Sequence, residues 1–104
     1  MPAAPTNFKE FFEITPQLVP TVAADVVAQD VWLDQLNFTN TTASPITVTV
    51  EDKQGTPRAA LSAFVVPGND SVVIAFNRRW MPGGIRWSAS ATNLVGYARY
   101  GVLS

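Results

Sequence analysis

The stretch Ile46-Thr47-Val48-Thr49-Val50 alternates apolar and polar side chains without a break. Successive side chains of a β-strand point to opposite faces of the sheet, so a period of two buries one face and leaves the other in water. Residues 85–91 repeat the pattern, with apolar side chains on one face and Arg86, Ser88 and Ser90 on the other. Both segments predict strands that each bury one face.

Further segments of the same character follow, separated by clusters of Gly, Pro, Asn and Asp that are typical of turns. We expect strands at residues 31–39, 59–66, 71–76 and 94–103, with one more from within residues 14–27. About six to eight antiparallel strands at this spacing predict an all-β fold, a single β-sandwich of the immunoglobulin-like or jelly-roll-like kind.

Side-chain alternation also predicts which residues are buried. In the strand at 31–39, it places Trp32, Leu36 and Phe38 on one face and Val31 and Leu33 on the other. The residues expected between the two sheets are Val48, Val50, Phe76, Ile85 and Trp87.

Residues 1–28 differ from residues 29–104, and we expect an extended N-terminal arm followed by the sandwich domain. Four of the eight prolines fall in this arm, and proline favours extended backbone around it. Phe8, Phe11 and Phe12 have the i, i+3, i+4 spacing of one helical face, which predicts a short helical turn. So short a helix is marginal in water, so these side chains need a surface to pack on. That surface is either the chain's own sandwich or another subunit.

The composition removes several classes of function. The chain has no cysteine and no histidine, which excludes disulfides, thiolate and imidazole metal ligands and the Ser-His-Asp triad. The net charge of −1 gives no basic excess for phosphate, so nucleic acid is not expected as the main partner. The N-terminus has no basic and apolar leader, and no apolar run is long enough to span a membrane. We therefore expect a protein made in a cytoplasm, with no membrane partner.

Charged residues make up 14% of the chain, below the usual ~25%. A surface with so few charges suits a protein that neighbouring subunits cover, although a small neutral monomer also fits. Carboxylates occur at Glu51-Asp52 and near the strand at 31–39, but nothing fixes a facing pair. The oxygen-rich turns at 40–42 and 69–71 lack the spaced acids of a calcium loop. We expect no catalytic residue, no cofactor and no metal site.

The segment 78–84 has an unusual composition, because two arginines, a tryptophan and a methionine precede Pro-Gly-Gly. Arg, Trp and Met are enriched in the centres of protein interfaces. We expect an irregular loop here, which either contacts a partner, folds back over the sandwich or stacks on a ligand. The candidate interface residues are Phe8, Phe11 and Phe12 in the arm and Arg78, Arg79, Trp80 and Met81 in this segment.

Part of the chain, from Leu36 to Tyr100, resembles the small virion accessory proteins of tailed phages. The resemblance is one of rhythm and turn placement, carried by LNFTN at 36–40, PITVTV at 45–50, DKQG at 52–55, FVVPG at 64–68, PGGIRWSAS at 82–90 and Gly96-Tyr97. It covers about two thirds of the chain, leaves out the arm and contains no catalytic motif.

The resemblance implies a structural protein of a phage-type virion: a capsid decoration protein, a head–tail connector or a tail component. Its partners are then other virion structural proteins and copies of itself, in a homo-oligomer or a lattice. The alternative is a β-sandwich module that binds carbohydrate at a cell surface through an exposed tryptophan and polar loops. A small hydrolase is the least favoured hypothesis.

Overall fold

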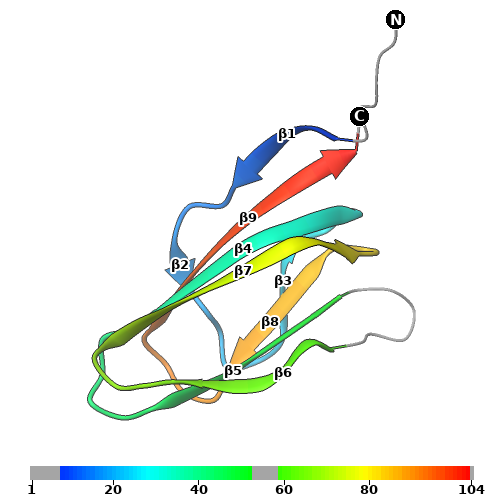
Figure 1. Cartoon of the computed structure of the whole chain (residues 1–104). Helices are drawn as coiled ribbons and strands as arrows, with labels where there is room; N and C mark the ends of the chain where they lie inside the picture. Colours follow the sequence, from blue (N-terminus) through cyan, green and yellow to red (C-terminus); the bar gives the residue numbers. More distant parts are fainter. Residues whose placement is uncertain (1–7, 53–58, 104) are drawn as a thin grey trace, which may run out of the picture.

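The computed structural model describes residues 8–52 and 59–103, and this part of the chain is all-β (Figure 1). Its strands are β1 (Phe8–Glu13), β2 (Gln17–Leu18), β3 (Ala24–Val27), β4 (Val31–Asn40), β5 (Ile46–Asp52), β6 (Ala59–Val66), β7 (Asp70–Met81), β8 (Ile85–Ala89) and β9 (Leu94–Leu103). Sheet A has the order β1-β9-β4-β7, with β2 also paired to β9, and sheet B has the order β3-β8-β5-β6. Strand pairing is antiparallel throughout.

The two sheets bury their facing side chains, which confirms the predicted all-β sandwich. β5 alternates buried and half-buried residues along its whole length, and β8 does the same. The buried apolar residues are Val19, Val27, Val31, Leu33, Leu36, Phe38, Ile46, Val48, Val50, Val66, Met81, Ile85, Trp87, Ala89, Leu94 and Ala98. Four of the five predicted core residues are among them, whereas Phe76 is only partly buried against this core.

A β-bulge in β4 overturns the predicted face of Trp32. Against β9 the register shifts by one residue between Leu33 and Gln35, so Asp34 is an extra residue on β4. Against β7 the register shifts at the same place, but there the extra residues are on β7, between Ala75 and Arg79. Such an insertion moves the side chains that follow it to the opposite faces. Val31 and Leu33 are therefore buried together with Leu36 and Phe38, while Trp32 points away from the core.

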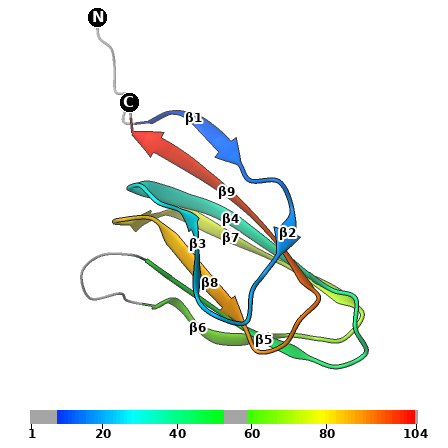
Figure 2. The ribbon, with the colours of Figure 1, turned by 180° about the vertical axis from the view of Figure 1, so that it is seen from behind.

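The N-terminal segment is part of the sandwich from Phe8 onward, and the predicted helical turn is wrong. β1 is a strand that pairs with the far end of β9, and β2 pairs with its beginning. The chain then crosses to sheet B, where β3 pairs with β8 (Figure 2). The spacing of the three phenylalanines fits a helix, but a helix there would leave the β9 edge without these backbone hydrogen bonds. The residues before Phe8 lie outside the described part.

The segment after Phe76 also differs from the expectation, because β7 continues as a strand to Met81. Arg78 interrupts it with a left-handed conformation (φ 56°), at the point where the register against β4 shifts. The turn begins only after Met81, where Gly83 and Gly84 have positive φ. The predicted loop at 78–81 is thus the bulged end of a strand.

At the opposite end of the sandwich, two turns are fastened together by Asn40. Its side-chain Nδ2 donates to the carbonyl oxygens of Ser44 (2.8 Å) and Val66 (3.1 Å), and its Oδ1 accepts from the backbone nitrogen of Thr42 (2.9 Å). Because Asn40 is buried, these bonds replace those that it would make with water. Gly68 completes the contact, since a Cβ there would lie 2.4 Å from the Ala43 carbonyl oxygen. The predicted turn at 52–55 lies, from residue 53 on, outside the described residues.

Candidate interaction surface

Two tryptophans stack on the outer side of sheet A, near the end of β7. Trp32 and Trp80 are registered partners on β4 and β7, and their ring centroids are 4.6 Å apart at an angle of 51°. Trp80 is 36% exposed, whereas Trp32 is half-buried. The indole Nε1 of Trp32 is covered and has no acceptor among the described residues. The pair therefore presents Trp80 as its accessible surface.

A second aromatic pair lies two strands away at the same end of the sheet. Phe12 of β1 and Tyr100 of β9 are registered partners, and their rings stack with centroids 5.9 Å apart. Tyr100 is in turn registered with Leu33, which is buried, so this pair is on the inner side of sheet A. Phe12 is nevertheless 39% exposed.

The strand register brings the two candidate interface segments to one end of sheet A, although about 70 residues separate them in sequence. Trp32 is the registered partner of both Gly101 and Trp80, and Gly101 is also the partner of Phe11. One row of registered residues (Phe11, Gly101, Trp32 and Trp80) thus crosses all four strands from β1 to β7. At about 4.8 Å per strand, the outer strands of this row are roughly 14 Å apart. We call this end of sheet A, which has Trp32 and Trp80 on its outer side and Phe12 and Tyr100 on its inner side, the aromatic end.

The candidate residues have different positions in this surface. Arg78, Arg79 and Trp80 are exposed on β7, and Phe12 is exposed on β1, the opposite outer strand of the same sheet. Met81 is 1% exposed and belongs to the core, so its assignment to the interface is wrong. The side chains of Phe8 and Phe11 lie outside the described part. Sequence reasoning missed Trp32 and Tyr100, because only the strand register shows that they support Trp80 and Phe12.

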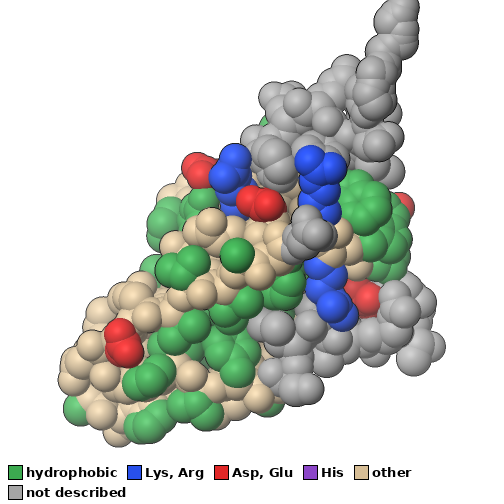
Figure 3. Space-filling view, in the orientation of Figure 1, with side chains coloured by type: hydrophobic (Ala, Val, Ile, Leu, Met, Phe, Trp, Pro, Cys, Tyr) green, Lys and Arg blue, Asp and Glu red, His purple; other side chains and the backbone are tan. Residues whose placement is uncertain are grey.

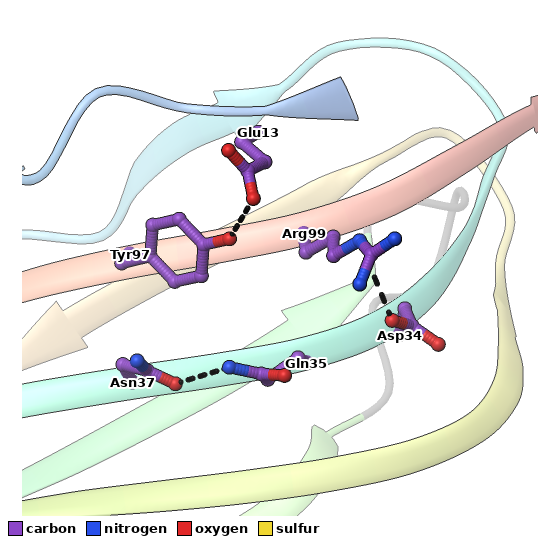
Figure 4. A network of polar contacts seen from close by, with 6 residues as sticks. All are labelled: Glu13, Asp34, Gln35, Asn37, Tyr97 and Arg99. Atoms are coloured by element: carbon purple, nitrogen blue, oxygen red, sulfur yellow. Dashed lines mark hydrogen bonds and ion pairs between the residues drawn. The ribbon is translucent and has the colours of Figure 1, made fainter. Parts of the chain in front are cut away.

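Polar side chains connect β1, β9 and β4 on the outer face next to the aromatic end (Figure 4). The Tyr97 hydroxyl donates to Glu13 Oε2 at 2.5 Å, which ties β1 to β9. Arg99 Nε lies 3.8 Å from Asp34 Oδ2, so the bulged residue of β4 is paired with β9. The hydrogen bond to Glu13 raises the pKa of Tyr97 above its usual 10.0, helped by partial burial. This network holds the edge strand β1 in place.

Most of the carboxylates considered for catalysis have a structural partner. Glu51 Oε1 lies 3.2 Å from Arg86 Nε across the β5–β8 pair, and Asp30 Oδ1 accepts from the backbone nitrogen of Gly83. Asp52, the last residue of β5, is 4% exposed. Within residues 8–52 and 59–103, no group of three or more acidic side chains could hold a metal ion.

A shallow pocket of about 390 Å³ lies where the two fastened turns meet, and it joins the oxygen-rich turns that the sequence showed separately. Its lining is polar and consists of Thr39, Asn40, Thr41, Asn69, Asp70 and Ser71. Thr39 Oγ1 and Ser71 Oγ are 3.0 Å apart, so each already has a partner. The pocket includes Asp70 at the start of β7, and Trp80 lies near the other end of this strand, at most about 33 Å away at ~3.3 Å per residue. No single sugar ring can contact both, which disfavours a carbohydrate site built from them.

The chain was compared with protein-family models, with curated proteins and with solved structures, and none of the three comparisons found a match. Among the described residues, no helix has the length and apolar character needed to cross a membrane.

Proposed function

We propose that this chain is a non-enzymatic assembly protein that binds neighbouring protein subunits through the aromatic end, as a structural component of a phage-type virion. The observation that carries the binding part is the convergence of β1 and the end of β7 on one row of sheet A. The virion part is supported by the sequence resemblance of residues 36–100.

The composition of the aromatic end supports a protein partner. Trp and Arg dominate the residues whose truncation most weakens protein interfaces. Trp80, Arg78 and Arg79 are adjacent and exposed here, and Phe12 adds an apolar side chain on the other side of the same sheet end. A partner that contacts both sides of this end would bury Phe12 and Trp80 together. Burial of each large apolar side chain contributes about 1.5–3 kcal/mol, reduced by the fraction that is already buried.

Alanine variants of the two exposed aromatic residues test the proposal. When material from the native source is fractionated by sedimentation, the wild-type chain should be found in particles or in an oligomer with a defined partner. Trp80→Ala and Phe12→Ala should release it while the fold, monitored by circular dichroism, is retained. Leu18→Ala is the matched control, because Leu18 is 62% exposed but lies on β2, away from the aromatic end.

Deletion of residues 2–13 is the stronger test, because it removes β1 entirely. The remaining chain keeps β4, β5, β8 and most of the buried core, so it should fold with a modest loss of stability. It should no longer enter particles. Normal incorporation of the truncated chain would show that the partner binds elsewhere, and failure to fold would show that β1 is needed for the sandwich itself.

The carbohydrate-binding module remains the competing proposal, and the same variants separate the two. A module would be monomeric, and its tryptophan fluorescence would change on titration with glycans. An assembly protein should show no such change, and its Trp80 fluorescence should shift when the partner binds.

A further inference from the structure

The two flanks of the sandwich are built differently. On one flank, the N-terminal segment runs along β9 and crosses to sheet B (Figure 2). Val19 donates its backbone N–H to Leu94 (2.8 Å), and the next carbonyl, of Pro20, accepts from Ala89 (2.8 Å). This segment therefore bonds to both sheets and closes the flank, and the side chain of its Val19 is buried in the core.

On the other flank, β7 is the last strand of sheet A and β6 is the last strand of sheet B. The outer edge of such a strand carries backbone N–H and C=O groups that can pair with another strand. Among the described residues, β4 is the one strand that pairs with β7. The β7 edge is long, since the strand has 12 residues, and its pairing with β4 is regular from Asp70 to Ala75.

Natural edge strands are protected by charge, shortness or bulges, and β7 lacks all three over residues 71–75, before the bulge that follows Ala75. The edge strand β3 has 4 residues, an aspartate and a register shift. The edge strand β1 contains Lys9, Glu10 and Glu13, and its register is also shifted. By contrast, residues 71–77 of β7 contain no charged residue, and the Val73 side chain is 61% exposed.

The charges that flank this neutral stretch are opposite in sign. Asp70 precedes it, and Arg78 and Arg79 follow it. In the space-filling view, an acidic side chain lies near the turn end and hydrophobic and uncharged side chains lie beyond it, while the basic side chains lie toward the other end with acidic ones among them (Figure 3). An antiparallel strand that reads basic, neutral, acidic in the opposite direction would complement this edge. β7 of a second copy has that order.

We propose that β7 pairs antiparallel with β7 of a second copy, which joins the two sheets A into one continuous sheet across a two-fold axis. In a pairing centred on Ile74, Val73 lies opposite Ala75 of the partner copy, and both are exposed on the outer face. The regular part of β7 ends at Ala75, and beyond it the bulged Arg78–Arg79 segment of each copy lies toward Asp70 of the other copy, at both ends of the paired stretch. A shift by one residue would place exposed side chains against inward ones, so the alternation limits the register.

This inference names one partner within the proposed function but rests on the β7 edge and not on the aromatic end. Trp80 lies beyond the paired stretch in each copy, so dimer formation leaves both aromatic ends accessible to other subunits. The two proposals can therefore fail separately: Trp80→Ala should leave the dimer intact even where it abolishes incorporation into particles.

The purified full chain should form a dimer whose population rises with concentration, measured by sedimentation velocity from about 1 μM to several hundred μM. A pairing of single strands buries less than the roughly 1,600 Å² of a standard stable interface, so we expect micromolar affinity. A chain that stays monomeric across this range overturns the proposal.

Val73→Lys should weaken the dimer at least tenfold, because it places two lysines near each other across the paired edges. Val65→Lys is the matched control: Val65 is 55% exposed and lies on β6, the edge strand of the other sheet. It should leave the dimer unchanged. An equal effect of both substitutions, or no effect of Val73→Lys, overturns the assignment to β7.

A charge exchange tests the register. Asp70→Arg alone and the double substitution Arg78→Asp with Arg79→Asp should each weaken the homodimer, since each places like charges together at both ends. When the two variant chains are mixed, both ends regain opposite charges, and a heterodimer should form, detectable by native mass spectrometry. If the mixture dimerises no better than either variant alone, the proposed register is wrong.

Discussion

Trp87 and Trp80 are the same type of side chain in two different environments of the sandwich. Trp87 is 2% exposed at the centre of sheet B, with Phe38 of the opposite sheet at 5.5 Å between ring centroids. Trp80 is 36% exposed at the end of sheet A, and its described aromatic neighbour is Trp32 on the adjacent strand. The first tryptophan is packed between sheets, and the second rests on one sheet alone.

The difference shows where stability and binding are separated in this molecule. In the centre, two sheets face each other and each apolar side chain finds partners from both. On the outer side of the aromatic end, Trp80 depends on its neighbour Trp32 within sheet A. Substitutions at the centre should therefore alter unfolding, and substitutions at the aromatic end should alter binding.

The largest effect on stability is expected from Trp87→Ala. Removal of a large buried aromatic side chain should lower the free energy of unfolding by about 3–5 kcal/mol. Chemical denaturation followed by circular dichroism measures this. A loss below about 1 kcal/mol would contradict the packing of Trp87 between the sheets.

A smaller loss is expected from Gly96→Ala, which adds one methyl group to the same packing. A Cβ at this position would lie 2.7 Å from both Trp87 Cη2 and Val19 Cγ2. Overpacking of this kind lowers stability by about 1–3 kcal/mol. Combination with Val19→Ala removes one of the two clashes, so the double variant should be more stable than the sum of the single losses predicts. Simple additivity would show that Gly96 does not contact Val19.

Trp80→Ala should separate the two regions most sharply. It loses one aromatic pair, worth about 0.5–1.5 kcal/mol, so the unfolding transition should shift little. Binding to the partner should be lost, as measured by particle incorporation. If unfolding instead changed as much as in Trp87→Ala, the aromatic end would be part of the core.

The smallest effect concerns pH at the β1 edge. The hydrogen bond to Glu13 raises the folded-state pKa of Tyr97. The contribution of this bond to the free energy of unfolding is therefore complete below the unfolded-state pKa of about 10, and it is lost as the pH rises through the folded-state pKa. The melting temperature of the wild type should therefore fall more steeply above pH ~10 than the melting temperature of Tyr97→Phe. Parallel curves for the two proteins would show that this bond contributes nothing to folding.

The sequence predicted the strands that alternate cleanly, because a period of two is visible without knowledge of the partner strand. It did not predict β1, since the strand that β1 pairs with lies about 90 residues further along the chain and the phenylalanine spacing also fits a helix. It also misplaced Trp32, because no residue type marks Asp34 as an insertion. The convergence of Phe12 and Trp80 depends on three strand pairings and has no local signal.

The Asp34 bulge divides β4 into two halves that are out of phase in sequence. Odd-numbered residues face the core before it, and even-numbered residues do so after it. A chain shortened by one residue at this point would restore a continuous strand, but one half would then turn its apolar side chains to solvent. Loss of Asp34 would thus change the phase of the side chains along β4 while leaving the composition almost unchanged. Either Trp32 would take the place of the core residues Val31 and Leu33, or Phe38 would become a surface residue.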